Sequence, residues 1–425
     1  MVGRNALIMN LIRAIDSVVL AINNKIKNNY TLGLLLFLSS IILISIREPA
    51  YVLCPRMWGE EGLVFYQFAL HHSLYEIFMT AHVGYLTLFN SVVSAMQARL
   101  FSVENAPAVS TYMGFLVQLV PIYIIGFCQH RFWDTSLKKI VCVIIVLVAT
   151  APEQWLNTTN SHFIFGLITF LIMMVSAANL SVFKKYFFRA LLIMGGLTGP
   201  VSILCTPTFI LKAYKEKTKE KYIQAGILLF CAVIQALVIV YSILFNNKYN
   251  RLEKNDNLRA FYHFVVDNFS MISQGTSSFF HYYIYYISIL SGGIMALVYM
   301  YLLFKNRKDE TIFIALLTMG IVGVFSTLGS LRMAGGPRYA YVPTCIFMMV
   351  LLTEAFKETK KNIVQYAISA AFSMCLLFYI LNYRKSMDAV YNSGLPSWKE
   401  ELKKHEADKK YNPKIHPGGA WEVIL

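Results

Sequence analysis

Charged residues are scarce in this sequence. Only 14% of its 425 residues are Asp, Glu, Lys or Arg, whereas 57% are hydrophobic. Soluble domains carry roughly 25% charged residues, so the composition excludes a water-soluble fold of this size. We also find no internal repeat and no P-loop, GxSxG, HExxH or Rossmann glycine pattern. The sequence therefore gives no support to cytoplasmic nucleotide chemistry.

Cysteine motifs are missing as well. The seven cysteines show no CxxC or CxxxC spacing, and most fall inside long apolar segments. A buried cysteine in such a segment behaves as a small apolar side chain. The spacing therefore predicts neither a disulfide framework nor a cysteine-bound metal.

The net charge of +15 would suit a nucleic-acid-binding protein, but the distribution of the basic residues argues against that class. Lysines and arginines lie in short clusters between apolar segments, which is typical of the cytoplasmic loops of membrane proteins. We therefore expect a lipid bilayer as a partner, and no nucleic acid.

What the sequence does have is long apolar segments. Each supplies most of the roughly 20 residues that cross about 30 Å of hydrocarbon. Lipid offers the backbone no hydrogen-bonding partners, and the alternating segments of a β-barrel are not seen, so these segments are expected to be helices. We predict an all-α polytopic membrane protein with about 11 transmembrane helices. They are expected at residues 32–47, 108–127, 139–152, 162–180, 189–199, 200–211, 222–245, 283–304, 311–328, 341–356 and 363–382.

The positive loop charges also predict the orientation, with the N-terminus in the cytoplasm and the C-terminus outside. The organisation that follows is an amphipathic cytoplasmic N-terminus, a transmembrane bundle with two long external loops, and a small external C-terminal cap. Their boundaries are 1–31, 32–382, 48–107, 246–282 and 383–425. Within the first loop, residues 63–101 predict two juxtamembrane helices on the outer face, although two further spans would also fit.

A Gly-Gly-Leu-Thr-Gly-Pro sequence at 195–200 interrupts the apolar segment 189–211. Such a break at membrane depth is tolerated where it lines a protein or water-filled cavity. We expect two short helices that meet near the outer face; a simple packing kink is the alternative.

The first external loop contains an acidic turn, Trp58-Gly59-Glu60-Glu61-Gly62. Adjacent carboxylates repel one another, which raises the pKa of one or both when they are partly buried. A general base or a metal ligand can be built in this way, and Glu60 and Glu61 could hold a divalent ion, although no ligand spacing demands one. The alternative is an acidic cap that favours the helix macrodipole.

Two other external loops are rich in polar and aromatic residues. In the first, Trp155, Asn157, Asn160 and His162 combine hydrogen-bonding groups with a stacking face, which suits carbohydrate; an ordinary interfacial loop is the alternative. Trp58, His82 and Tyr85 are further candidates for sugar or acceptor binding. Asn157 also begins a glycosylation sequon.

The second loop contains Arg338, Tyr339 and Tyr341 after two glycines and a proline. External arginines run against the charge bias, and the fork of Arg338 suits a phosphate, to which either tyrosine could donate. Pairing of Arg338 with an internal carboxylate is the alternative.

These features together resemble the GT-C superfamily of integral membrane glycosyltransferases. The resemblance covers the topology of most of the chain, the acidic motif in the first external loop, the juxtamembrane helices after it and the later polar loops. In that family an Asp or Glu near the end of the first span deprotonates the acceptor hydroxyl, and the donor is a polyprenyl-phosphate sugar. The resemblance implies Glu60 or Glu61 as the base, and Arg338 with Tyr339 as the phosphate clamp.

This chain has Glu-Glu where many members of the superfamily carry an Asp, and its C-terminal segment is short. The resemblance therefore implies a bacterial inner-membrane enzyme that modifies a lipid-linked or surface glycan on the periplasmic face, in the manner of O-antigen-modifying glucosyltransferases. The competing interpretations are a flippase for lipid-linked saccharides, an O-antigen polymerase or ligase, and a non-catalytic scaffold. Flippase sites usually sit near the bilayer midplane, where this sequence has few charges.

Overall fold

The computed structural model describes most of the chain, in eight ranges. These are residues 29–178, 180–245, 269, 285–328, 337–357, 363–383, 397–418 and 421–425. Every regular element within them is a helix, accompanied only by isolated β-bridges, so the all-α prediction is confirmed for this part of the protein. The expected N-terminal helix and most of the external loop 246–282 lie outside the described residues.

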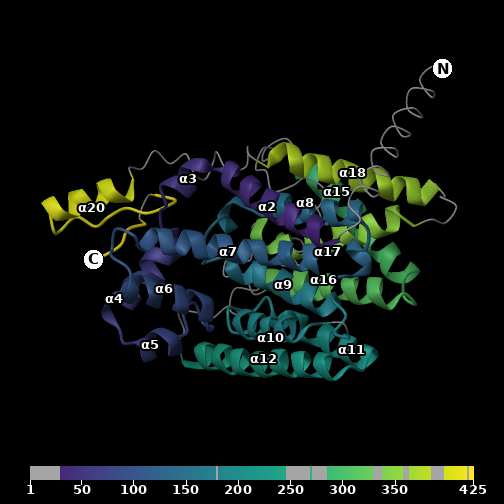
Figure 1. The fold of residues 1–425 in the computed structure, drawn as a ribbon, viewed down its shortest axis with the longest axis horizontal. Coiled ribbons are helices and arrows are strands. Elements are labelled where there is room, and N and C mark those ends of the chain that lie inside the picture. The colour runs from purple at the N-terminus through teal and green to yellow at the C-terminus, as the bar shows by residue number, and fades with distance from the viewer. Residues whose placement is uncertain are drawn as a thin grey trace, which may run out of the picture.

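Each expected span overlaps a helix of the bundle (Figure 1). These helices are α2 (Asn29–Arg47), α7 (Ala106–Phe127), α8 (Ser136–Ala149), α9 (Ser161–Met174), α10 (Val182–Gly196), α11 (Thr206–Glu216), α12 (Lys219–Phe245), α15 (Tyr285–Lys305), α16 (Glu310–Leu328), α17 (Pro337–Ala355) and α18 (Ile363–Asn382).

The number of spans, however, differs from the prediction. Among the described residues, 4 helices are long and apolar enough to cross a membrane, namely α2, α7, α12 and α18. Others are shorter: α9, for example, has 14 residues and so rises only about 21 Å, against about 30 Å of hydrocarbon. By the length and composition of its described helices, the protein thus does not reach the expected number of about 11 crossings. Four helices of this kind nevertheless indicate a membrane protein.

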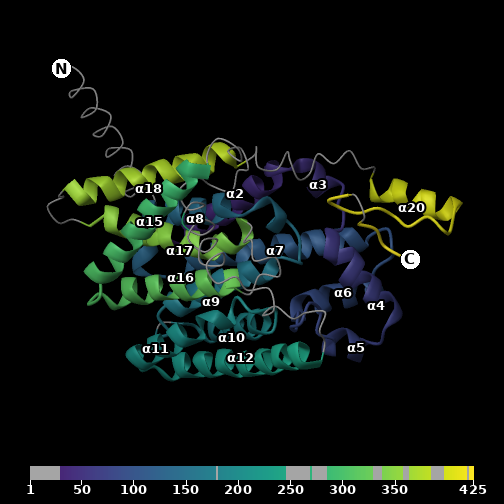
Figure 2. The ribbon, with the colours of Figure 1, turned by 180° about the vertical axis from the view of Figure 1, so that it is seen from behind.

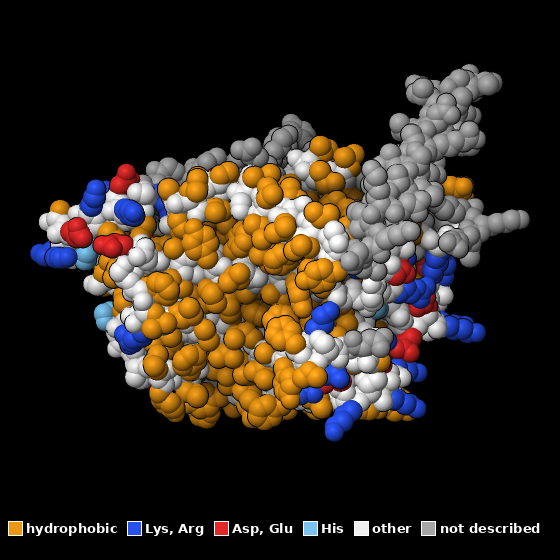
Figure 3. Space-filling model, viewed as in Figure 1, with side chains coloured by type: hydrophobic (Ala, Val, Ile, Leu, Met, Phe, Trp, Pro, Cys, Tyr) orange, Lys and Arg blue, Asp and Glu red, His pale blue; other side chains and the backbone are white. Residues whose placement is uncertain are grey.

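The surface agrees with a membrane protein. Figure 3 shows hydrophobic side chains over the middle of one face, with charged side chains collected toward the two ends. On α12, for instance, Phe230, Leu237 and Tyr241 each expose about two thirds of their area. An apolar surface of this extent is unusual in a soluble monomer, and it is expected where lipid covers the protein.

The core of the bundle is built around α9 and α17. From Phe163 to Met174, every residue of α9 is buried, and α17 is buried from Ala340 to Thr353. The two helices pack on one another, and α17 also packs on α8, α16 and α18. Neighbouring helices cover α9 and α17 on all sides. The buried parts of both helices are therefore apolar around the whole helix and lack the amphipathic stripe of a surface helix.

Short helices form one end of the molecule, on the left in Figure 1 and on the right in Figure 2. They are α3 (Pro49–Leu53), the π-helix η1 (Glu61–Tyr66), α4 (Gln67–His71), α5 (Leu74–Met79), α6 (Leu88–Leu100) and, from the C-terminal region, α20 (Trp398–Ala407). With 13 residues, α6 is the longest of those between residues 63 and 101. The structure therefore replaces the two expected juxtamembrane helices by several shorter ones, and none of them is long enough for a further span.

The expected break between α10 and α11 lies at residues 197–205 and ends in the 3-10 turn η4 (Ile203–Cys205). It is held by the start of α6 and the residues just before it. The Leu88 N–H donates to the Leu197 carbonyl at 2.9 Å, and the Gly199 N–H donates to the Leu86 carbonyl at 2.9 Å. Gln235 of α12 pairs with the backbone of Leu86 through both its amide oxygen and its amide nitrogen, each at 3.0 Å. The break is therefore joined to the short-helix end of the molecule.

Candidate functional site

The acidic turn is organised around the buried carboxylate of Glu61. One oxygen of Glu61 accepts the N–H of Trp58 at 2.8 Å. The other accepts the Thr158 hydroxyl at 2.7 Å and also the Thr158 N–H. Burial raises the pKa of Glu61 to about 7, against the opposing effect of these hydrogen bonds. Because Glu61 is 1% exposed and both its oxygens are occupied, a substrate hydroxyl has no free access to it.

The hydrogen bond from the Trp58 N–H to Glu61 resembles the bond that the third residue of a capping box accepts. One of the two Glu61 oxygens therefore acts as a cap, which was the alternative interpretation of the acidic turn. The other oxygen reaches a loop far along the chain. The turn continues into η1, and π-helical turns of this kind are frequent at functional sites.

Glu60 has the opposite environment. Its residue is half-buried, and among the described residues no N–H or O–H group donates a hydrogen bond to its carboxylate. It lies close enough to Arg338 to contribute to that residue's electrostatics. The two adjacent carboxylates are therefore distinct, one enclosed and hydrogen-bonded, the other open.

Arg338 stands in the first turn of α17, where its guanidinium donates to the Glu153 carboxylate at 2.9 Å. Burial lowers the pKa of Arg338, but the negative charges of Glu153 and Glu60 raise it, and the net change is upward. The sequence left open whether Arg338 pairs with a carboxylate, and in the structure it pairs with Glu153. About a third of the Arg338 side chain stays exposed, and its ring neighbour is Tyr339, 5.4 Å from the guanidinium carbon to the ring centre.

The loop between α8 and α9 is held together by its own polar side chains. The amide nitrogens of Asn157 and Asn160 both donate to the Glu153 carbonyl, at 2.7 and 2.6 Å. Both asparagines are buried, so the sequon at Asn157 is not presented to a glycosylating enzyme in the folded protein. Their amide groups thus shape the loop that carries Glu153 and Thr158. The sequence led us to expect that they bind a sugar, but buried side chains are not open to one.

Trp155 and Tyr341 are also buried. Trp155 is therefore not open to a sugar, nor Tyr341 to a phosphate, as the sequence had led us to expect. Trp155 is 1% exposed and lies under the guanidinium of Arg47, 4.6 Å from the ring centre. Tyr341 is 2% exposed and interacts with the side chain of Thr150. Trp58 is 8% exposed, which leaves little of its ring for a ligand.

The remaining candidates divide into two places. Tyr85 and His162 face one another with ring centres 6.4 Å apart, and Gly199 of the break lies against both. His82 instead contacts the rings of Phe65 and Phe68, and burial lowers its pKa to about 4, so it is neutral at physiological pH.

The structure thus brings three segments together: the acidic turn, the loop 153–158 with the start of α9, and the first turn of α17. Thr158 bonds to Glu61, Arg338 pairs with Glu153 and lies near Glu60, and Tyr339 packs on Phe163. Thr158 and Glu153 are the residues of this site that the sequence did not single out. The signal for Glu153 was its position as the sole acidic residue of its loop, whereas Thr158 gave none. Within the described ranges, no group of three or more His, Cys, Asp or Glu side chains could hold a metal ion.

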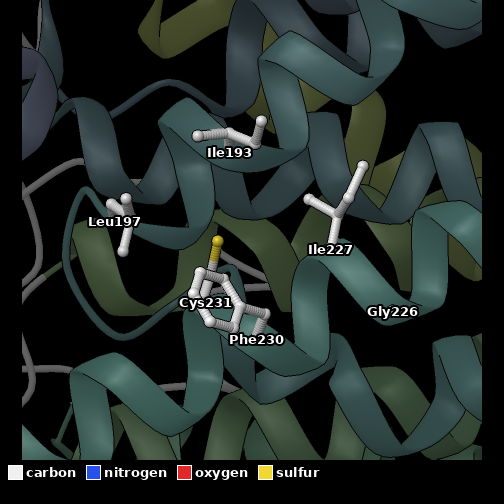
Figure 4. Close-up of a pocket in the computed structure, with 6 residues that line it drawn as sticks. All are labelled: Ile193, Leu197, Gly226, Ile227, Phe230 and Cys231. Carbon is white, nitrogen blue, oxygen red and sulfur yellow. The ribbon is translucent and has the colours of Figure 1, made fainter.

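An apolar pocket of about 320 Å³ lies between α10 and α12 (Figure 4). It is lined by Ile193, Leu197, Gly226, Ile227, Phe230 and Cys231. Leu197 is also the first residue of the break, so the pocket adjoins the segment that contacts Tyr85 and His162. Phe230 is largely exposed, which places the pocket at the apolar surface of the molecule.

Comparison with protein-family models, curated proteins and solved structures gives no significant match to this chain.

Proposed function

We propose that this protein is a membrane glycosyltransferase that moves a sugar from a polyprenyl-phosphate donor to a hydroxyl group of a glycan or lipid-linked acceptor. The observation that carries the proposal is the contrast between the two carboxylates of the acidic turn. Glu60 is open, accepts no hydrogen bond from the described residues, and lies near Arg338. Glu61 is enclosed and ties the turn to Thr158. We therefore assign Glu60 as the general base and Glu61 as a positioning residue.

The reaction is an inverting displacement. The acceptor hydroxyl gives its proton to the Glu60 carboxylate while its oxygen bonds to the anomeric carbon of the sugar. The bond from that carbon to the phosphate oxygen breaks, and its electron pair leaves with the polyprenyl phosphate. Negative charge grows on the phosphate in the transition state, so a guanidinium placed there stabilises the transition state more than the bound substrate.

Arg338 is the candidate for that role. One of its nitrogens donates to Glu153, and the exposed third of the side chain leaves part of its five-donor fork for a phosphate. The ion pair with Glu153 fixes the direction of the guanidinium before a donor binds, which lowers the entropy cost of binding. The Tyr339 ring makes a T-shaped contact with Phe163 beside it, and its hydroxyl could donate to the same anion.

The pocket between α10 and α12 suits the isoprenoid tail of such a donor. Its lining is apolar and it opens on the surface that we expect to face lipid. It adjoins the break at Leu197, and two residues further on Gly199 touches Tyr85 and His162. A tail in this pocket would therefore bring its head group toward the polar loops.

We also infer the membrane arrangement in finer detail. The shorter helices cross the bilayer as members of a bundle, because neighbours such as α7 and α12 screen them from lipid. The short-helix end then lies on the periplasmic face of a bacterial inner membrane, together with the C-terminus, and the N-terminus is cytoplasmic. Labelling of a cysteine introduced at Ser397 tests this orientation, since access from the cytoplasmic side alone would reverse it.

The decisive experiment compares Glu60→Gln, Glu61→Gln and the exposed control Glu104→Gln in lipid nanodiscs. Radiolabelled polyprenyl-phosphate glucose and cell-envelope glycans serve as donor and acceptor. We expect Glu60→Gln to reduce the transfer rate roughly a hundredfold or more, with the thermal stability unchanged. Glu61→Gln should lower both rate and stability. Transfer by Glu60→Gln at the rate of the control would remove Glu60 as the base, and flipping of the donor without transfer by the unaltered protein would favour a flippase.

A further inference from the structure

The segment that follows α20 folds back on itself. The Ile415 N–H donates to the Trp421 carbonyl at 3.1 Å, and the Val423 N–H donates to the Pro413 carbonyl at 3.0 Å. The two arms therefore pair in an antiparallel manner. We call these two arms, residues 411–418 and 421–425, the tail hairpin.

The tail hairpin is bonded directly to the backbone of the acidic turn. The Gly59 N–H donates to the His416 carbonyl at 2.6 Å, and the His416 N–H donates to the Met57 carbonyl at 3.1 Å. Trp58 and His416 consequently form a parallel β-bridge. Two main-chain hydrogen bonds thus fix the turn independently of its contact with Thr158.

The glycines of the turn are explained by the same contact. A Cβ atom on Gly62 would stand 2.6 Å from Ile415 and 2.7 Å from Val423, and one on Gly59 would stand 3.3 Å from the ring of Trp421. Real Cβ atoms do not approach other atoms as closely as the first two distances. Glycine at these positions therefore lets the tail hairpin lie flat on the turn.

The other end of the hairpin is anchored as well. The buried Glu401 carboxylate of α20 accepts the Tyr411 hydroxyl at 2.6 Å and the Lys414 N–H at 2.9 Å. The indole N–H of Trp398 donates to the Val103 carbonyl at 2.9 Å, just before α7. The hairpin is thus attached to the bundle and does not rest on the turn alone.

We propose that the tail hairpin is a positioning element of the active site, with Trp421 and His416 as its positioning residues. This inference rests on the proposed function, in which Glu60 is the base. Glu60 stands between Gly59, which the hairpin holds, and Glu61, which Thr158 holds. Its backbone is fixed from both sides while its carboxylate stays open, which is the arrangement that a general base requires.

The test compares Trp421→Ala, Trp421→Phe and Ile424→Ala in the full chain. Ile424 lies in the same hairpin but is half exposed, so it is the matched control. Three quantities are measured: hydrogen exchange of the backbone amides of residues 57–62, the transfer rate, and the affinity for polyprenyl phosphate alone. For Trp421→Ala we expect faster exchange at Gly59, transfer reduced about a hundredfold, and unchanged affinity for the lipid phosphate. Trp421→Phe should restore most of the rate.

A second pair, Gly62→Ala with Gly293→Ala as control, tests the same contact without removing an aromatic residue. A Cβ on Gly293 meets no atom within 4 Å, so this variant should behave as the unaltered protein. Unchanged exchange of residues 57–62 in both Trp421→Ala and Gly62→Ala would overturn the docking. Faster exchange with an undiminished transfer rate would overturn the positioning role. Because exchange is measured without substrate, failure of the glycosyltransferase assignment would show separately, in the Glu60→Gln assay.

Discussion

The hydroxyl group of Thr158 donates a 2.7 Å hydrogen bond to the carboxylate of Glu61, a residue 97 positions earlier in the chain. The backbone N–H of the same threonine donates to the same oxygen. A single residue of the loop between α8 and α9 thus supplies two of the three hydrogen bonds that the Glu61 carboxylate accepts. Neither oxygen of Glu61 is left without a donor, which meets the requirement for burying a carboxylate.

This relationship predicts that Thr158→Val is destabilising. The substitution removes the hydroxyl donor and keeps the shape of the side chain, so it leaves a buried carboxylate with one hydrogen bond fewer. We expect the free energy of unfolding to fall by about 1–3 kcal/mol, measured by denaturation in detergent. Thr159→Val is the matched control, because the Thr159 hydroxyl has no partner among the described residues. Equal losses in the two variants would contradict a specific role for Thr158.

A pH dependence follows from Glu61. Its pKa is about 7 in the folded protein, above the ordinary value of 4.5. Between these pH values the folded protein keeps the proton that the unfolded chain releases. The free energy of unfolding should therefore fall as the pH rises through this window, by roughly 3 kcal/mol at most, and then level off.

The measurement is the difference in melting temperature between the unaltered protein and Glu61→Gln, from about pH 4 to about pH 8. His82 and His416, whose pKa values burial lowers to about 4, act in the opposite direction, but both proteins contain them and the difference removes their effect. A difference that does not vary with pH would mean that Glu61 ionises normally.

Arg47 predicts a large effect on stability away from the site. Its guanidinium donates to the carbonyls of Tyr383 and Thr150, at 2.9 and 3.0 Å, and lies over the rings of Trp155 and Tyr383. Arg47→Lys loses the planar fork and should reduce the free energy of unfolding by roughly 3 kcal/mol.

The control for Arg47 is Arg99→Lys, since Arg99 is exposed and its recorded hydrogen bond is to the His72 carbonyl. Thermal unfolding in detergent should place this variant within about 0.5 kcal/mol of the unaltered protein. A similar small loss for Arg47→Lys would show that the contacts of Arg47 with Thr150 and Tyr383 contribute little to stability.

The apolar pocket predicts a selective effect on the donor. Gly226 faces open space, so Gly226→Leu should fill the pocket without strain. We expect the KM for a long polyprenyl-phosphate donor to rise about tenfold, a loss of about 1.4 kcal/mol of binding free energy, while a short-chain isoprenyl donor is unaffected. Gly293→Leu is the control on α15. An equal effect on both donors would remove the pocket as the tail site.

Several parts of this molecule could be predicted from the sequence because they depend on local pattern. Apolar segments gave the helices, since lipid or core leaves the backbone no other way to satisfy its polar groups. The Gly195–Pro200 sequence gave the break between α10 and α11. The acidic turn and Arg338 were chosen because their charges run against their surroundings, and the structure brings Glu60 near Arg338.

Other features depend on distant contacts that no local pattern reveals. A tryptophan in a polar loop predicts a stacking surface for a sugar, yet Trp155 is buried because Arg47 and Tyr383 cover it. Asn157 and Asn160 read as ligand-binding groups, yet they bond to a carbonyl of their own loop. Apolar composition predicted about 11 spans, but only four of the described helices are long and apolar enough by themselves. Composition does not set the length of a helix; neighbouring helices and turns do.

The contact between the acidic turn and the tail hairpin also bears on the order in which the protein is assembled. The turn is synthesised soon after α2, whereas His416 and Trp421 follow α18 and α20. Contacts between segments so far apart in the chain form late in folding, after the intervening helices are in place. A ribosome that stops before residue 411 would therefore release a protein whose helices can enter the membrane but whose acidic turn lacks one of its two supports. Competence for chemistry would be reached only after the helices have been assembled.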